Sequence, residues 1–494
     1  MTKEIRQDLQ IIRGFAIISV VGFHFYPETF PNGYLGVDQF FVLSGYLMCM
    51  LLQNSIQNPW YTFIGFFYFR RLKRILPLYF LTIFGTLLAI FSTLTIYEID
   101  ENLPSAKQAL VFMSNMPRNQ SAEQMGYFQK LISSADFFTH TWSLSVEVQY
   151  YFMVPFLFLF TKPVSLKSRI AIFLVIGLLS SIHFIFSGGY TAFNSVFSRT
   201  WQFVMGMIVY LKSLEEKENS EIFEREKVNL LEDSEDSEKK IVPKNQGYLK
   251  KYSNLILFIT VAITMYGTPF SAAQVRFPVT LLTSLYIYAS SKSSLIIDNF
   301  LVYTGNISFS LYLIHWPIYE FWKCQTEGFS EYEKQLALLA ALLFSIILSV
   351  FVHETFEKWS LKIHWKHLTL LVTVLAALNF MTLQKTGISK FVNILDSSER
   401  SFPSVHISLI NKTFSSYDDV EAQNQEWHLA DDLNLRNPAT GTWRDVVTHR
   451  MLLKNHTGEN KFLIMGSSSA ARLAHLIQDE CGFLANEMIQ LTFA

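Results

Sequence analysis

Two ionisable side chains interrupt the first apolar stretch of the chain, and their spacing gives them a common direction. Arg13 and His24 are separated by ten residues. On an α-helix, this step returns the chain to within about 20° of its starting face and raises it by about 16 Å. Ionisable residues within an apolar span are costly and usually face a cavity or a pathway. The pair therefore predicts a working site that contains a guanidinium and an imidazole.

A carboxylate follows shortly after this pair. The chain turns through Pro27, Pro31 and Gly33 and enters a second apolar stretch that carries Asp38. A tight hairpin would return Asp38 to the level of His24, where it could orient the imidazole and set its protonation. A role as a helix N-cap is equally open.

Further polar residues lie within later apolar stretches. His140, Ser143 and Glu147 follow the i, i+3, i+7 spacing of one helical face. A carboxylate inside an apolar span is costly unless it is paired or protonated, which favours a functional role for Glu147. Arg199 is the natural candidate to neutralise it. His315 is another buried ionisable residue, for which an interhelical hydrogen bond is the alternative interpretation.

A cluster of cations precedes the third apolar stretch. Arg70, Arg71, Lys73 and Arg74 occupy four of five consecutive positions. Arginine binds phosphate through two parallel hydrogen bonds, so the cluster could hold a polyphosphate at a cytoplasmic opening together with Arg13. Ordinary anchoring of the cytoplasmic end of a span would give the same pattern.

The composition identifies the kind of element that must position these residues. Half of the 494 residues are apolar, only 16% are charged, and there are 45 Phe and 9 Trp. These values indicate an all-α polytopic membrane protein. The net charge of -1 carries no nucleic-acid signature. The three Cys lie far apart, so neither a disulfide nor a metal site is predicted.

Eleven stretches are long and apolar enough to be candidate spans of the bilayer. They lie at about 9–27, 36–53, 75–96, 138–160, 170–187, 194–211, 253–267, 276–291, 305–322, 335–352 and 367–384. We interpret the first as an uncleaved signal anchor. Short loops rich in Lys and Arg share one side, which predicts a cytoplasmic N-terminus and an extracytoplasmic C-terminus, in the endoplasmic reticulum or plasma membrane.

Glycosylation sequons agree with this orientation. Asn119, Asn411 and Asn455 would face the glycosylating side, whereas Asn306 would lie near the cytoplasmic end of a span and stay unmodified. Residues 212–252 carry mixed charges and few aromatic residues, so we expect a flexible cytoplasmic insert there.

Several motifs, taken in order, resemble the acyltransferase-3 family over about residues 5–355. They are Arg-x10-His, Gly-Val-Asp-x-Phe-Phe-Val-Leu-Ser-Gly, Phe-x-x-Arg-Arg-x-x-Arg-Ile-x-Pro-x-Tyr, Trp-Ser-Leu-x-x-Glu, the segment 199–206 and Ser-Phe-Ser-Leu-Tyr-Leu-x-His-x-Pro. The resemblance implies a ten-helix core, to which 367–384 adds an eleventh span. It also implies a membrane O-acyltransferase that moves an acyl group, most simply acetyl, from cytoplasmic acyl-CoA to a hydroxyl at the far face. The acceptor would be a carbohydrate, a lipid or another molecule, and no tightly bound cofactor is implied.

The resemblance also assigns residues. Arg13 and His24 match the family's catalytic pair, and Glu147 and His315 match buried motif positions. As a hypothesis, His24 is a general base or a transient acyl acceptor, and Asp38 or Glu147 sets its protonation. The candidate residues for binding the substrate or the acyl-CoA are Arg70, Arg71, Arg74, Arg199 and His315.

The last part of the chain has the composition of a soluble region. Residues 461–472 predict a short strand, a turn of small residues and the start of a helix, which resembles the first block of an SGNH hydrolase-like domain. Ser468 would occupy the nucleophile position. The Asp-x-x-His block that would activate it is absent, so we expect a truncated, incomplete α/β segment at 461–494 with a vestigial serine. Residues 385–460 would form an extracytoplasmic linker.

Two other functions stay open from the sequence. Buried Arg, His and Glu residues also mark the pathways of transporters and flippases. A catalytically silent family member with a regulatory role is the third interpretation, favoured by the incomplete C-terminal segment and opposed by the intact Arg13 and His24 pair.

Overall fold

The structure is a computed structural model, and it describes ten stretches of the chain. These are residues 6–94, 96–117, 136–187, 189–232, 252–290, 298–326, 329–384, 446–452, 460–466 and 485–493. The chain divides into two compact units, Met1–Ser397 and Ser398–Ala494, and each is described by itself. Three predicted sequons, at Asn119, Asn411 and Asn455, and the predicted nucleophile Ser468 lie outside the described residues.

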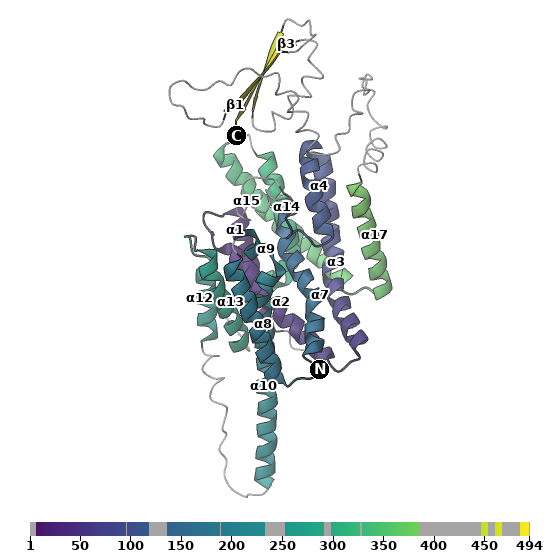
Figure 1. Ribbon diagram of the computed structural model, residues 1–494, viewed down its shortest axis with the longest axis vertical. Helices are drawn as coiled ribbons and strands as arrows, with labels where there is room; N and C mark the ends of the chain where they lie inside the picture. The colour runs from purple at the N-terminus through teal and green to yellow at the C-terminus, as the bar shows by residue number, and fades with distance from the viewer. Residues whose placement is uncertain are drawn as a thin grey trace. The chain divides into compact units, whose positions relative to one another are not determined.

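The first unit is built of helices, most of them long and apolar (Figure 1). They are α1 (Gln7–Phe25), α2 (Gly36–Ser55), α3 (Trp60–Thr93), α4 (Ile96–Leu110), α7 (Trp142–Phe160), α8 (Leu166–Phe186), α9 (Gly189–Asn194), α10 (Val196–Glu232), α12 (Ser253–Thr264), α13 (Ala272–Ala289), α14 (Asp298–Gln325), α15 (Glu331–Val352), α16 (Lys358–Ser360) and α17 (Trp365–Leu383). Two 3-10 turns, η1 (Gly33–Leu35) and η2 (Thr139–Thr141), precede α2 and α7. A π-helical turn, η3 (His353–Glu357), follows α15.

The all-α membrane architecture is confirmed. Within the described ranges, seven helical stretches are long and apolar enough to cross a membrane. They are Gln7–Phe25, Gly33–Ser55, Trp60–Thr93, Thr139–Phe160, Leu166–Phe186, Glu331–Ser360 and Trp365–Leu383. The other four predicted spans coincide with α10, α12, α13 and α14. The protein is therefore an integral, multi-pass membrane protein.

Glycines set the closest contacts between helices. A Cβ atom on Gly14 of α1 would collide with the backbone of Leu301 in α14, and one on Gly305 would collide with the backbone of Gln10. The pair α2 and α10 repeats this reciprocal arrangement, because a Cβ atom on Gly45 would collide with the backbone of Phe203 and one on Gly206 with the backbone of Val42. Small residues let helix backbones approach closely in membranes. These four glycines therefore fix two helix pairs around the centre of the unit.

One predicted span is longer in the structure, and one helix was not predicted. α3 begins at Trp60, fifteen residues before the expected start at 75, so the cation cluster lies within a 34-residue helix. α17 packs on this helix, with Asn379 Nδ2 donating to the carbonyl oxygen of Phe80 at 2.9 Å. α4 was not predicted, because its mean hydropathy is too low for a span.

The charged stretch predicted as a flexible insert at 212–252 is helical in its first part. α10 continues through its first part to Glu232 and extends beyond α8 (Figure 1). Lys212 pairs with Glu215 at 2.7 Å, and Lys217 pairs with Glu221 at 3.8 Å. Pairs at these spacings stabilise an exposed helix, which explains why mixed charge here does not prevent helix formation.

The second unit contains a small mixed sheet. Its strands are β1 (Val446–Leu452), β2 (Asn460–Gly466) and β3 (Ala485–Phe493), in the order β1-β3-β2. β2 pairs with β3 in parallel and coincides with the strand predicted from the sequence, whereas β1 pairs with β3 in antiparallel fashion. β1 lies inside the stretch predicted as linker, so the sheet begins earlier than expected. The predicted turn and helix start after β2 lie outside the described residues.

Candidate active site

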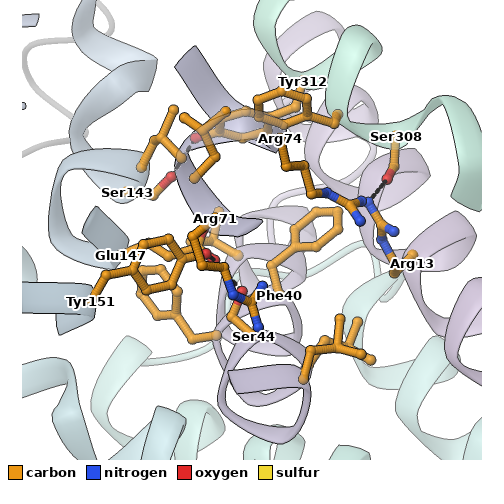
Figure 2. Close-up of a pocket in the computed structure, with 17 residues that line it drawn as sticks. Arg13, Phe40, Ser44, Arg71, Arg74, Ser143, Glu147, Tyr151, Ser308 and Tyr312 are labelled. Atoms are coloured by element: carbon orange, nitrogen blue, oxygen red, sulfur yellow. Dashed lines mark hydrogen bonds between the residues drawn. The ribbon is translucent and has the colours of Figure 1, made fainter. Parts of the chain in front are cut away.

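A pocket in the first unit collects residues from five helices. It lies between α1, α2, α3, α7 and α14. Figure 2 shows Arg13 and Arg74 with neighbouring guanidinium groups, and Glu147 beside Tyr151 in another part of the pocket. The described lining comprises Arg13, Val37, Phe40, Phe41, Leu43, Ser44, Leu47, Arg71, Arg74, Ile75, Ser143, Leu144, Glu147, Tyr151, Ser308, Phe309 and Tyr312.

The charges of this lining are unequal. Arg13, Arg71 and Arg74 supply three positive charges, against one carboxylate from Glu147. Arg13 Nη2 donates to Ser308 Oγ at 2.9 Å. Arg71 stacks on the ring of Tyr151 with its guanidinium carbon 5.3 Å from the ring centroid. A site with excess positive charge is suited to an anionic ligand.

The predicted cation cluster therefore divides in the structure. Arg71 and Arg74 line the pocket, whereas Arg70 is exposed and stacks on Phe66 at 4.9 Å. Lys73 donates to the carbonyl oxygen of Ile363 at 2.8 Å. The expectation that Arg70 contributes to the same site is wrong, because its side chain is exposed and stacks on Phe66 instead.

Glu147 is held by hydroxyl groups. Its Oε1 accepts a hydrogen bond from Ser44 of α2 and another from Tyr151 at 2.5 Å. The predicted pairing with Arg199 is wrong, because Arg199 lies elsewhere. Glu147 thus keeps its place in the pocket through neutral donors, which leaves its charge to act on the pocket.

Asp38 has a different role from the predicted ones. It lies in the first turn of α2, whose N-cap is Leu35, and it is fully buried. Its Oδ1 accepts hydrogen bonds from Arg199 at 3.2 Å, Arg276 at 2.7 Å and Gln202. Neither the N-cap nor the orientation of His24 is observed, because two arginines from α10 and α13 occupy the carboxylate. Asp38 therefore joins three helices.

His24 pairs with a second histidine. Its Nδ1 lies 2.8 Å from His315 Nε2, and the two rings are nearly parallel, 11° apart. The edge of Trp316 packs on His24 with centroids 4.7 Å apart. Both histidines are buried, so the interhelical hydrogen bond considered for His315 is present and its partner is His24.

The hydrogen-bond pattern fixes the neutral tautomers of this pair. His315 Nδ1 lies 2.7 Å from the carbonyl oxygen of Leu311, which can only accept. In the neutral ring, His315 Nδ1 therefore carries the proton and Nε2 accepts from His24 Nδ1–H. The lone pair of His24 is consequently on Nε2, which makes that atom the base or nucleophile of the pair.

Tyr312 connects the pocket to the histidines. It lines the pocket, and its ring centroid lies 5.9 Å from that of His315. Its hydroxyl donates to the carbonyl oxygen of His140 at 2.6 Å and receives a hydrogen bond from Ser143 at 2.5 Å. The predicted face of His140, Ser143 and Glu147 is therefore divided: Ser143 and Glu147 line the pocket, and His140 lies nearer the histidine pair, 6.2 Å from His315 between centroids.

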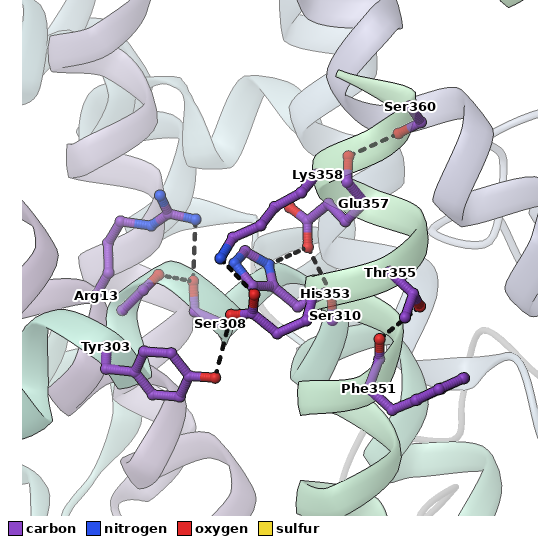
Figure 3. A network of polar contacts seen from close by, with 12 residues as sticks. Arg13, Tyr303, Ser308, Ser310, Phe351, His353, Thr355, Glu357, Lys358 and Ser360 are labelled. Carbon is purple, nitrogen blue, oxygen red and sulfur yellow. Dashed lines mark hydrogen bonds and ion pairs between the residues drawn. The ribbon is translucent and has the colours of Figure 1, made fainter. Parts of the chain in front are cut away.

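α14 supplies a hydrogen-bond partner to each of the two α1 residues, Arg13 and His24. Ser308 contacts Arg13 and His315 contacts His24, so the two helices run in the same direction. The far side of α14 is fixed by η3, where Glu357 Oε2 accepts from Ser310 at 2.6 Å and from His353 at 2.8 Å (Figure 3). π-helical turns are frequent near functional sites.

Several of these residues were not predicted to act. They are the neutral residues Ser44, Tyr151, Ser308 and Tyr312. A neutral side chain can lie in an apolar span at little cost in free energy, so its presence there does not indicate a function. Arg276 did give such a signal, since it is a cation at the start of a predicted span.

Comparison with known proteins identifies the family. The model of an acyltransferase domain matches residues 6–354. The chain belongs to the acyltransferase-3 family. It is 29% identical over 206 residues to the O-acetyltransferase OatA of Staphylococcus aureus strain NCTC 8325 / PS 47, and equally to OatA of strain COL. The match covers 40% of this chain and 33% of each relative, so the chain spans about a third of the length of these relatives. No solved structure matches.

The chain therefore carries an acyltransferase domain within a multi-pass membrane protein.

Proposed function

We propose that the protein transfers an acetyl group from acetyl-CoA, bound in the pocket of Arg13, Arg71 and Arg74, to a hydroxyl acceptor, with His24 Nε2 as the reacting base. The acetyl group is suggested by the relatives, which are O-acetyltransferases. The single observation that carries the proposal is the series of contacts from His24 Nδ1 to His315 Nε2 and from His315 Nδ1 to the carbonyl oxygen of Leu311, because in neutral rings it leaves a lone pair on His24 Nε2.

The donor would bind by its two ends. The phosphates of CoA match the excess positive charge of the pocket. Arg13 and His24 are eleven positions apart on one helix, a rise of about 16 Å. The extended arm between the phosphates and the thioester would run along α1 and pass Tyr312, which separates the pocket from the histidines.

The chemistry balances with these groups. His24 Nε2 removes the proton of the acceptor hydroxyl, whose oxygen attacks the thioester carbonyl carbon. A C–O bond forms, the C–S bond breaks, and the proton leaves His24 for the CoA thiolate. In a two-step variant, Nε2 attacks the thioester carbon and the CoA thiolate leaves as the C–S bond breaks. The acceptor oxygen then attacks the same carbon and displaces the imidazole, and the proton of the acceptor hydroxyl passes to the thiolate. Positive charge that develops on the His24 ring is stabilised by His315, whose Nε2 accepts a hydrogen bond from His24 Nδ1.

The test follows label from radioactive acetyl-CoA into lipid, glycan and protein fractions, using the full chain in membranes. We expect transfer by the wild type and by Ser468→Ala, and its loss in His24→Ala. Transfer at the wild-type rate by a folded His24→Ala protein would refute the role of His24. Movement of substrate across the membrane without acetyl transfer would instead support a transporter.

A further inference from the structure

The guanidinium groups of Arg13 and Arg74 lie beside each other in the pocket (Figure 2). Arg74 is the charged side chain that acts most strongly on Arg13, and the two like charges repel. In a site that is shielded from water, such repulsion is costly unless a negative charge lies nearby. The two arginines therefore need a counter-charge whenever no anionic ligand is bound.

The carboxylate in the lining supplies only part of this counter-charge. Glu147 lies in another part of the pocket, away from the two guanidinium groups (Figure 2). Its attraction for Arg13 is weaker than that of a second carboxylate, Glu357, which does not line the pocket. Glu357 also attracts Arg74. A negative charge that acts on both arginines thus comes from outside the lining.

The π-helical turn η3 holds the Glu357 carboxylate in place. The side chain is buried, and its Oε2 accepts hydrogen bonds from Ser310 Oγ at 2.6 Å and from His353 Nδ1 at 2.8 Å (Figure 3). Two donors to one oxygen favour the ionised carboxylate. Ser310 lies two positions after Ser308 on α14, and Ser308 Oγ accepts from Arg13 at 2.9 Å. The same helix therefore contacts both the carboxylate and the arginine.

This fixed charge affects the binding of an anionic ligand. Phosphate groups would be attracted by Arg13 and Arg74 and repelled by Glu357. Acetyl-CoA and CoA carry the same phosphates, so the repulsion weakens the binding of both. A contribution that is common to the bound substrate and the transition state alters binding and leaves kcat for the chemical step unchanged. A weaker hold on CoA favours release of the product.

We infer that Glu357 is a positioning residue of the donor pocket: it holds the side chains of Arg13 and Arg74 in the empty pocket and offsets part of their charge, which sets the affinity for CoA. This assignment rests on the proposed function, which brings the CoA phosphates to these arginines. Its effect has a definite sign. Removal of the carboxylate strengthens the binding of CoA, whereas loss of a purely structural residue would weaken it or leave it unchanged.

Titration with CoA tests this role without turnover. The full chain in nanodiscs is titrated by calorimetry, and Tm is measured for every variant. Glu357→Gln removes the charge and keeps the size, and we expect its Kd for CoA to fall by about fivefold. Glu357→Met, a second neutral variant, should show the same fall. Glu357→Asp keeps the charge and should bind CoA like the wild type.

The matched control is Glu354→Gln, on the same turn. Glu354 is exposed and pairs with Lys358 at 2.6 Å, so its replacement should leave the Kd for CoA unchanged. An equal fall in Kd for this variant would indicate a general effect of net charge and would overturn the inference. An unchanged or higher Kd in the folded neutral variants of Glu357 would also overturn it.

A thioester without phosphates gives a further check. The KM for S-acetylpantetheine in steady-state assays should be the same in the wild type and in Glu357→Gln, because no phosphate meets the carboxylate. A KM that falls as much as the KM for acetyl-CoA would contradict a role through charge.

Pyrophosphate separates this inference from the identity of the donor. No binding of CoA by the wild type would refute acetyl-CoA as the donor. Glu357→Gln should still bind pyrophosphate more tightly than the wild type does. Equal Kd values for pyrophosphate would refute the role of Glu357, whether or not CoA binds.

Discussion

His24 Nδ1 lies 2.8 Å from His315 Nε2, and no carboxylate takes this position. His315 is itself fixed by the carbonyl oxygen of Leu311. The imidazole of His315 thus orients that of His24, and the carbonyl oxygen of Leu311 in turn orients His315. A histidine acceptor carries no full charge, so it orients His24 without the strong electrostatic stabilisation that a carboxylate would give to a protonated ring.

Two replacements of His315 distinguish its hydrogen bond to His24 from the space that its side chain fills. His315→Gln offers a side-chain oxygen that can accept from His24 Nδ1–H, whereas His315→Phe fills similar space without an acceptor. We expect kcat to fall by about 100-fold in His315→Phe and by much less in His315→Gln. The measurement is kcat for acetyl transfer, with thermal unfolding as the control for folding. Equal losses in both variants would show that the hydrogen bond to His24 does not contribute.

Arg71 and Arg70 form a matched pair for donor binding. Arg71 lines the pocket, whereas Arg70 is exposed beside Phe66. Arg71→Met should raise the Kd for acetyl-CoA by about 10-fold or more, since a charged hydrogen bond contributes about 1.5–3 kcal/mol. Arg70→Met should leave it unchanged. Titration with acetyl-CoA at two salt concentrations measures both, and an equal weakening in the two variants would contradict a specific phosphate contact.

Asp38→Asn tests whether this carboxylate acts on stability or on His24. The variant leaves Arg199 and Arg276 buried without a counter-charge, and breaking such a network costs about 3–5 kcal/mol. We expect a lower Tm and an unchanged pH dependence of kcat in the protein that remains folded. A shifted pH profile at an unchanged Tm would instead restore the hypothesis that Asp38 sets the protonation of His24.

The contact of α2 with α10 predicts the effect of one methyl group. Gly206→Ala would place a Cβ against the backbone of Val42 and Tyr46, so the helices would have to separate. Gly65→Ala on α3 is the control, because no atom lies within 4 Å of its Cβ position. We expect a clear fall in Tm for the first variant. The second should be neutral or more stable by up to about 1 kcal/mol, because Ala favours the helix. Similar effects of the two would contradict close packing at Gly206.

The sequence predicts the helices and the central pair far better than it predicts partners. Apolar runs and buried charges are visible in one dimension, which is why the spans and the positions of Arg13, His24 and Glu147 could be chosen. Which carboxylate meets which arginine depends on the rotation and depth of separate helices, so Arg199 was assigned to Glu147 although it contacts Asp38. The predicted span at 194–211 ended before α10 does for a different reason. Pairs between oppositely charged residues stabilise the rest of the helix without any apolar face.

The parallel pairing of α1 and α14 has a consequence for motion. Gly14 and Gly305 hold the two backbones in direct contact, so the two helices form one closely packed pair. Arg13 and His24 both lie on α1, so their spacing along this pair stays the same while substrates enter and products leave. Opening of the donor site must come from α2, α3 or α7, which supply the rest of its lining and would move around this stationary pair.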